Sequence, residues 1–178
     1  MPATWKTTLR LLLQKLAAES GQHPRVAVLG IGNTFRSDDA AGVLVARALS
    51  RRVSDNAHLL VCEAGHAPEN KTAEVRKFAP DLVLLIDAAD LGKAPGTVEW
   101  ISEEDIDGMS ASTHSLPLSM LARYLKLEIG CEVNLLGIQL ASNEVGETIS
   151  PEVLQAVEEV AAGLDEIICD CISVSSLT

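Results

Sequence analysis

The apolar positions of this chain fall into short runs, separated by longer segments whose apolar residues recur at helical spacing. The short runs are rich in Val, Leu and Ile and are bounded by turn residues, which predicts β-strands. These runs cover residues 25–30, 57–64, 81–89, 97–102 and 131–140. The run 81–89 is apolar along most of its length, as expected of a strand that is covered on both faces. We expect the run 97–102 to lie at the edge of the sheet.

The segments between these runs predict helices. An amphipathic helix is expected within residues 1–24, where four leucines share one face: Leu9, Leu12, Leu13 and Leu16. Further helices are expected from a cap at Ser37 or Asp38 to about Ser50, over residues 67–79, from about Leu116, and from Ser150 onward.

The alternation of strands and helices predicts an α/β fold. We expect a mostly parallel twisted sheet of about five strands, with helices on both faces and one antiparallel edge strand. The length of the chain, residues 1–178, suits a single domain with a substantial core. The N-terminal helical extension, residues 1–24, is expected to pack on the sheet.

Composition narrows the range of partners. The net charge is −11 and the pI is near 4.7, which argues against nucleic acid or an anionic membrane surface, because both attract basic proteins. No apolar run approaches the roughly 18–20 residues of a membrane span. The cysteines include no CxxC pair, and Cys169 with Cys171 offers too few ligands for a structural zinc site. We therefore expect a cytoplasmic protein, and a monomer because no exposed apolar stripe is evident.

The stretch VLGIGNTFRSDDAAG, residues 28–42, follows the first predicted strand and begins like a phosphate-binding loop. A dinucleotide-binding fingerprint would place a third glycine at position 35 and a phosphate at the start of the next helix. The chain has Phe35 instead, and Asp38 and Asp39 occupy the place where the anion would sit. Two carboxylates there would repel a pyrophosphate, which disfavours nucleotide binding.

Ligands of parallel α/β sheets bind beyond the carboxyl ends of the strands, and this rule selects a small group of residues. Asp39 follows the first strand, Asp87 ends the third, and His114 lies in a polar loop that could fold over the same edge. Two carboxylates and an imidazole suit a divalent metal such as nickel or zinc, with positions left open for other ligands. The same edge carries residues that could contact a bound peptide or ligand: Gly30, Gly32 and Asn33.

Each of the three polar residues also has a purely structural interpretation. Asp39 could complement the dipole of the helix that follows it. Asp87 could cap the next turn, and His114 could be an ordinary polar loop residue. The residues alone therefore indicate a candidate metal or acid site at the edge of a sheet, and they leave the reaction open.

Five sequence blocks, which fall in order between residues 30 and 139, resemble a known family. They are GIGNTFRSDDAAG, GHAPEN, IDAADLGKAPG, STHSLPLSML and NLLGIQ. The first matches the pattern G-x-G-N-x-x-x-x-D-[DE]-x-x-G of the endopeptidases that mature the large subunit of nickel–iron hydrogenases. The others are similar to the formate-hydrogenlyase (hydrogenase 3) branch of that family. The first block alone is only partly specific, whereas all of them in order make a strong match.

The resemblance implies an endopeptidase, and hence a hydrolase, that acts on a hydrogenase large-subunit precursor. Such an enzyme removes the C-terminal extension of the precursor after nickel has been inserted. The metal-contacting residues of the family would fall on Asp39, Asp87 and His114, and Asp38 would be a supporting acid. The nickel belongs to the precursor in this family, so the resting enzyme is expected to carry no metal of its own.

The sequence departs from the family pattern in two places and leaves the chemistry open. It has Glu63-Ala64-Gly65 after the second strand, where the family usually has Asp-Gly-Gly, and residues 1–24 precede the usual start. It contains no HExxH or GxSxG motif and no cysteine near His114 in sequence, which disfavours standard zinc, serine and cysteine mechanisms. The metal could activate water as a Lewis acid, or it could serve only for recognition while an aspartate acts as the base. The alternatives are a doubly wound nucleotide-binding module and a nickel carrier without peptidase activity.

Overall fold

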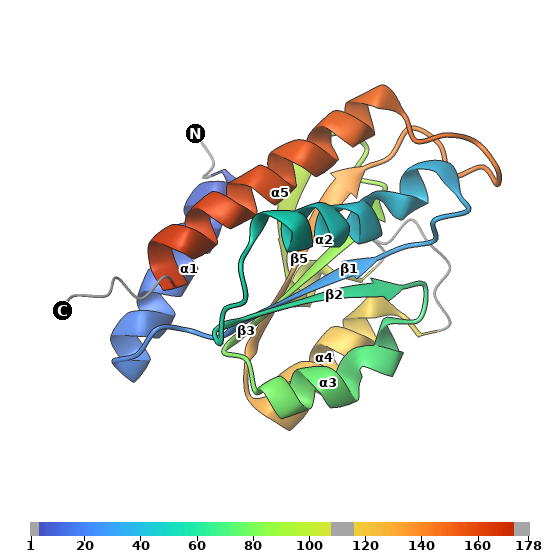
Figure 1. The fold of residues 1–178 in the computed structure, drawn as a ribbon. Coiled ribbons are helices and arrows are strands. Elements are labelled where there is room, and N and C mark those ends of the chain that lie inside the picture. Colours follow the sequence, from blue (N-terminus) through green and yellow to red (C-terminus); the bar gives the residue numbers. More distant parts are fainter. Residues whose placement is uncertain (1–3, 108–115, 173–178) are drawn as a thin grey trace.

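The computed structural model describes residues 4–107 and 116–172, which form a twisted five-stranded sheet covered by helices (Figure 1). The strands are β1 (Val26–Ile31), β2 (Leu59–Gly65), β3 (Leu82–Ala89), β4 (Val98–Ser102) and β5 (Glu132–Gln139). Their spatial order is β2-β1-β3-β5-β4. Strand β4 pairs antiparallel with β5, and the other pairs are parallel. The predicted α/β fold with an antiparallel edge strand is confirmed.

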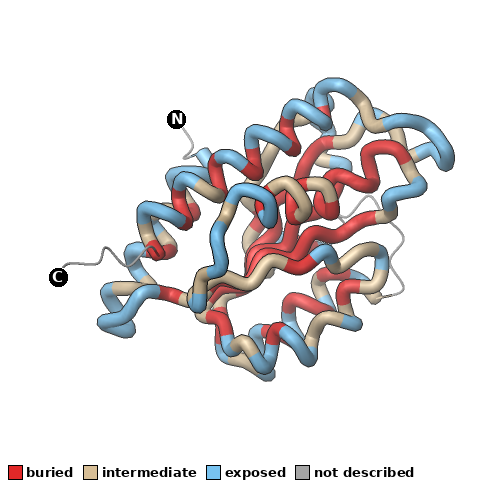
Figure 2. Tube along the Cα trace, viewed as in Figure 1, coloured by how far each residue is buried: buried red, intermediate tan, exposed pale blue. Residues whose placement is uncertain are grey.

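Helices cover both faces of this sheet. They are α1 (Trp5–Ser20), α2 (Ala41–Arg52), α3 (Thr72–Phe78), α4 (Leu118–Ile129) and α5 (Pro151–Ile172), with short 3-10 turns η1 (Ser37–Ala40), η2 (Pro68–Lys71) and η3 (Glu103–Asp105). Apolar residues of α1, α2 and α5 form one core cluster with the sheet, and those of α3 and α4 form the other. Figure 2 shows the buried residues running through the strands between these helical layers. Within the described ranges, no helix combines the length and the apolar composition of a membrane span.

The chain leaves β1 and β3 in opposite directions across the sheet. From β1 it passes through α2 to β2 on one side, whereas from β3 it passes through β4 and α4 to β5 on the other. The carboxyl ends of β1 and β3 therefore flank the point at which the connections diverge. Open α/β sheets bind their ligands at such a point, and the sequence predicts Asp39 and Asp87 at this edge.

Helix α2 lies very close to β1 and β3 because glycines occupy the contact. A Cβ atom on Gly42 would lie 2.0 Å from the carbonyl oxygen of Ile86 and 2.3 Å from that of Ile31. A Cβ atom on Gly30 would lie 2.2 Å from the carbonyl oxygen of Gly42. Only glycine fits at both positions, so this pair brings the start of α2 directly against the carboxyl ends of the two strands.

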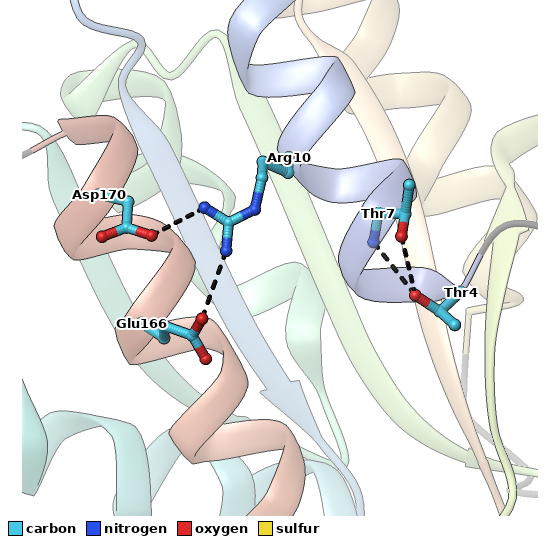
Figure 3. A network of polar contacts seen from close by, with 5 residues as sticks. All are labelled: Thr4, Thr7, Arg10, Glu166 and Asp170. Carbon is cyan, nitrogen blue, oxygen red and sulfur yellow. Dashed lines mark hydrogen bonds and ion pairs between the residues drawn. The ribbon is translucent and has the colours of Figure 1, made fainter.

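The N-terminal helix α1 packs mainly against α5 and also contacts β4, the edge strand of the sheet. Leu9 and Leu13 are buried in the cluster that α1 shares with α2 and α5. On the outer side, Arg10 donates hydrogen bonds to Asp170 at 2.7 Å and to Glu166 at 3.4 Å, and both acceptors belong to α5 (Figure 3). Exposed ion pairs contribute little stability, so burial of the leucines is the main force that holds α1 in place.

The helix caps agree only in part with the sequence analysis. Thr4 caps α1, and its side-chain oxygen accepts a hydrogen bond from the Thr7 backbone N–H at 3.3 Å (Figure 3). The predicted cap of the second helix at Ser37 or Asp38 is wrong, because neither side chain bonds to the first turn and α2 begins only after η1. Both side chains bond instead to a distant loop, residues 141–150.

The outer face of α4 exposes three large apolar residues. Met120, Tyr124 and Leu127 are all exposed, and their spacing of four and three residues places them on one side of the helix. The sequence analysis expects no exposed apolar stripe, and on α4 that expectation is wrong. The monomeric state itself stays a prediction.

Candidate active site

Asp39 lies in η1, where the chain turns from β1 into α2. Its carboxylate oxygen Oδ2 accepts a hydrogen bond from the Asn33 backbone N–H at 3.1 Å. The same N–H also donates to the Asp39 carbonyl oxygen, with a nitrogen-to-oxygen distance of 3.2 Å. The Asp39 N–H donates to the Arg36 carbonyl oxygen at 2.9 Å. The residue is only 3% exposed. The turn therefore holds the Asp39 carboxylate in a defined orientation at the carboxyl edge of the sheet.

Asp87 is fully buried near the carboxyl end of β3. Side chains alternate between the faces of a strand: Leu84 and Ile86 join the cluster of α1, α2 and α5, whereas Leu85 joins that of α3 and α4. Asp87 continues this alternation, so its carboxylate lies on the side of α3 and α4. A buried carboxylate is costly unless donors or a cation compensate it. Its presence at the end of an apolar strand therefore marks a candidate functional position.

The structure brings Asp39 and Asp87 to one edge of the sheet. The turn η1, which carries Asp39, contacts β3, and β1 and β3 are paired neighbours. The third predicted residue, His114, lies in residues 108–115, outside the described part of the chain. Within the described ranges, no group of three His, Cys, Asp or Glu side chains is arranged to hold a metal ion. The structure thus supplies two carboxylates, and their completion by His114 stays a prediction.

Asp38 is also fully buried, but its carboxylate binds a different part of the chain. Oδ2 accepts hydrogen bonds from the backbone N–H groups of Ala141 and Ser142 at 2.8 and 3.0 Å and from the Ser150 hydroxyl at 2.9 Å. Oδ1 accepts one from the Ser150 backbone N–H at 2.7 Å. Burial alone would raise the pKa of Asp38, but these hydrogen bonds outweigh burial and hold the pKa below its usual value. Asp38 therefore ties η1 to the loop 141–150 as an ionised carboxylate.

Replacing Asp38 by asparagine is expected to lower the free energy of unfolding by roughly 2–4 kcal/mol, because one buried acceptor oxygen becomes a donor that faces other N–H groups. Chemical denaturation at pH 7, followed by circular dichroism, measures the loss. Asp105→Asn is the matched control, since Asp105 is exposed and, within the described residues, its carboxylate accepts one hydrogen bond, from the Ser102 hydroxyl at 2.7 Å. If Asp38→Asn destabilised the protein no more than the control does, the structural role of Asp38 would be wrong.

The residues predicted to contact substrate also shape the turn around Asp39. Gly30 permits the close approach of α2. Gly32 has a φ angle of 139°, and a Cβ atom there would lie 1.8 Å from the Asp39 carbonyl oxygen. The side-chain oxygen of Asn33 accepts a hydrogen bond from the Phe35 N–H at 2.9 Å, while its backbone N–H binds Asp39. All three therefore help to orient the Asp39 carboxylate, and their contact with substrate stays a prediction.

The departure from the family pattern at Glu63 has a local explanation. Arg47 of α2 donates two hydrogen bonds to the Glu63 carboxylate, at 2.8 and 3.3 Å, and this bonding lowers the pKa of Glu63. Gly65 makes the turn at the end of the strand, with a φ angle of 65°, and its carbonyl oxygen accepts the Gly32 N–H at 3.0 Å. The acidic side chain thus pairs with the helix surface, while glycine is kept where the turn requires it.

Sequence analysis missed two supporting features of this edge. One is the loop 141–150, which binds Asp38 although its sequence indicates only an ordinary polar connection. The other is Gln139 at the end of β5, whose side-chain oxygen accepts the N–H groups of Leu91 and Lys93 at 2.6 and 3.1 Å and so fixes the chain after β3. A buried glutamine that ends an apolar run is a signal for such a role, because a buried amide requires partners.

Comparisons with known proteins match this chain to hydrogenase maturation proteases. The family model "HycI: Hydrogenase maturation protease" matches residues 43–172, a span that contains Asp87 and His114 and begins shortly after Asp39. The hydrogenase 3 maturation protease of Escherichia coli strain K12 is 39% identical over 113 residues, which are 63% of this chain and 70% of that protein.

Solved structures of this family have the same fold. The crystal structure of a nickel–iron hydrogenase maturation protease, HycI from Thermococcus kodakarensis KOD1, matches with a TM-score of 0.77 at 34% identity, covering 88% of this chain and 98% of that one. The solution structure of the endopeptidase HycI from Escherichia coli matches with a TM-score of 0.71 at 34% identity, covering 80% and 90%. The sheet, the carboxylate pair at its edge and these matches lead to one conclusion. This chain belongs to the hydrogenase maturation protease family.

Proposed function

We propose that this protein is an endopeptidase that removes the C-terminal extension of a hydrogenase large-subunit precursor once the precursor carries nickel. The precursor nickel would be contacted by Asp39, Asp87 and His114, with Asp38 as the acid that supports the turn. One observation carries the proposal: two buried carboxylates lie at the point where the connections of the sheet diverge, in a chain of this protease family.

The course of the chain supports a contribution from His114. Strand β5 begins at the amino edge of the sheet, so α4, which precedes it, begins at the carboxyl edge (Figure 1). Helix α4 starts at Leu118, shortly after His114, and packs on the side of the sheet to which Asp87 is directed. A residue just before this helix therefore needs only a short connection to approach Asp87.

The chemistry of the carboxylate pair suits an ion that arrives with the substrate. Two carboxylates and an imidazole fill only part of the coordination sphere of nickel and leave positions for the ligands that hold it in the precursor. Burial strengthens the attraction between Asp39, Asp87 and a cation, because the surroundings screen charge less than water does. A precursor without nickel would lack this attraction. We therefore expect the enzyme to carry no metal of its own and to distinguish the two forms of precursor.

Two routes to peptide hydrolysis fit the site. In one, the nickel polarises the scissile carbonyl or activates a water molecule. In the other, the nickel only anchors the precursor, and an aspartate accepts the proton of the attacking water. A cysteine nucleophile is disfavoured at two of the thiols, since burial raises the pKa of Cys62 and of Cys131 to about 11 and keeps both protonated at neutral pH.

The proposal is tested by the mass of the large-subunit precursor before and after incubation with the enzyme. Nickel-loaded and nickel-free precursors are compared in parallel. We expect the loaded precursor to lose its C-terminal extension and the nickel-free precursor to be cut at least about 100-fold more slowly, because several kcal/mol of charge stabilisation would be missing. Equal cleavage of both would contradict nickel recognition. Binding of the loaded precursor without any cleavage would favour a nickel carrier instead.

A further inference from the structure

Two large apolar side chains are exposed beside the candidate active site. Phe35 is 78% exposed and Val145 is 70% exposed. Phe35 belongs to residues 33–36 and Val145 to residues 143–146, and these two segments together are here called the ledge. The chain has only two phenylalanines, and the other, Phe78, packs against the cluster of α3 and α4. An aromatic side chain held in solvent, where it gains nothing for the fold, is a feature of binding surfaces.

Hydrogen bonds join the two parts of the ledge into one unit. The Gly146 N–H donates to the Phe35 carbonyl oxygen at 3.0 Å. Arg36 donates through Nε to the Asn143 carbonyl oxygen at 3.2 Å. The bonds of Asp38 to the same loop fix the base of the ledge. The apolar pair is thus presented on a preorganised surface and not on two independent loops.

The ledge is continuous with the turn that holds Asp39. The Phe35 N–H donates to the side-chain oxygen of Asn33, and the Asn33 N–H donates to the Asp39 carboxylate. Ser37 has a φ angle of 37°, which is unfavourable for a residue other than glycine. Its hydroxyl donates to the Thr148 carbonyl oxygen at 3.0 Å, so the loop helps to hold this strained residue in place. Hydrogen bonds therefore join the segments that carry the apolar pair to the turn that carries the candidate catalytic carboxylate.

We infer that Phe35 and Val145 bind an apolar side chain of the precursor polypeptide, close to the bond that is cleaved. This inference rests on the proposed function and names the residues that select the peptide segment. A protease must hold a segment of its substrate beside the catalytic groups. This apolar pair suits the task because hydrogen bonds hold its backbone in place. Phenylalanine and valine also have few rotatable bonds to order when the peptide binds.

Steady-state kinetics on nickel-loaded precursor test the inference. Phe35→Ser and Val145→Ser should each raise KM roughly 10-fold and change kcat by less than about twofold, as expected for residues that bind ground state and transition state alike. Phe35→Leu should recover most of the affinity because it restores an apolar surface. Leu127→Ser is the matched control: Leu127 is 76% exposed but lies near the C-terminal end of α4, towards the opposite edge of the sheet. Its KM should equal that of the wild type.

The outcomes separate this inference from the proposed function. If the wild type cleaves the precursor and Phe35→Ser has the same KM, the ledge is not a binding surface, while the proposed function stands. An equal rise of KM in Leu127→Ser would also overturn the inference, because the effect would then not be specific to the ledge. Absence of cleavage by the wild type would overturn the proposed function and the inference together. Thermal unfolding of each variant confirms that it is folded.

Discussion

Replacing Asp87 by asparagine is expected to slow cleavage of the nickel-loaded precursor by at least about 100-fold. Asparagine has nearly the shape of aspartate but no negative charge, so a cation in this buried site loses one of its attractive partners. Asp39→Asn should behave in the same way. Single-turnover cleavage, followed by the mass of the large subunit, measures the effect, and circular dichroism shows whether each variant is folded.

Asp90→Asn serves as the control for this experiment. Asp90 follows the end of β3 but is exposed, and the hydrogen bond that its carboxylate accepts within the described residues, from the Gly92 N–H, is long at 3.3 Å. Its replacement should leave the cleavage rate unchanged. A folded Asp87→Asn variant with full activity would remove Asp87 from the site. If Asp90→Asn slowed cleavage as much as Asp87→Asn does, the overall negative charge at this edge, and not Asp87 itself, would determine the cleavage rate.

Replacing Gly42 by alanine is expected to prevent folding, with a cost above about 4 kcal/mol. The new Cβ atom would lie 2.0 Å from the Ile86 carbonyl oxygen and 2.3 Å from that of Ile31. Both obstacles are backbone atoms of central strands, so α2 would have to move away from the sheet and carry η1 with it. The soluble yield of the variant and the midpoint of its chemical unfolding measure the effect.

Gly163→Ala separates this steric cost from the general effect of changing a helical glycine. A Cβ atom on Gly163 would meet Lys6 Cε at 2.7 Å and Trp5 Cη2 at 2.8 Å, which are the far ends of side chains on α1. These ends can shift, and alanine favours a helix by up to about 1 kcal/mol over glycine. The Gly163 variant should therefore fold with nearly wild-type stability. A Gly42→Ala variant of comparable stability would show that α2 does not need its close approach to the strands.

The fold and the position of two candidate site residues could be predicted because they depend on local patterns. Runs of Val, Leu and Ile become strands when both faces of a sheet are covered, and the observed strands differ from the predicted ranges by only a few residues at their ends. Asp39 and Asp87 follow from the rule that ligands bind beyond the carboxyl ends of parallel strands. This rule needs only the order of elements along the chain.

The partners of Asp38 and Ser37 could not be predicted, because they depend on distant contacts. A serine and an aspartate before a helix favour a cap on local grounds, yet both side chains bind the loop 141–150, more than 100 residues away in sequence. The same limit applies to the exposed stripe of α4. Met120 and Leu127 resemble core residues in the sequence, and only the packing of the helix shows that they face outward.

The position of a nickel ion in the folded protein tests the proposed site most directly. Crystals soaked with excess nickel can be measured at the nickel absorption edge, where anomalous scattering locates the ion. We expect a single ion at the carboxyl edge of β1 and β3, roughly 2 Å from carboxylate oxygens of Asp39 and Asp87 and from an imidazole nitrogen of His114. Nickel bound elsewhere, with His114 directed away from both carboxylates, would contradict the proposed site.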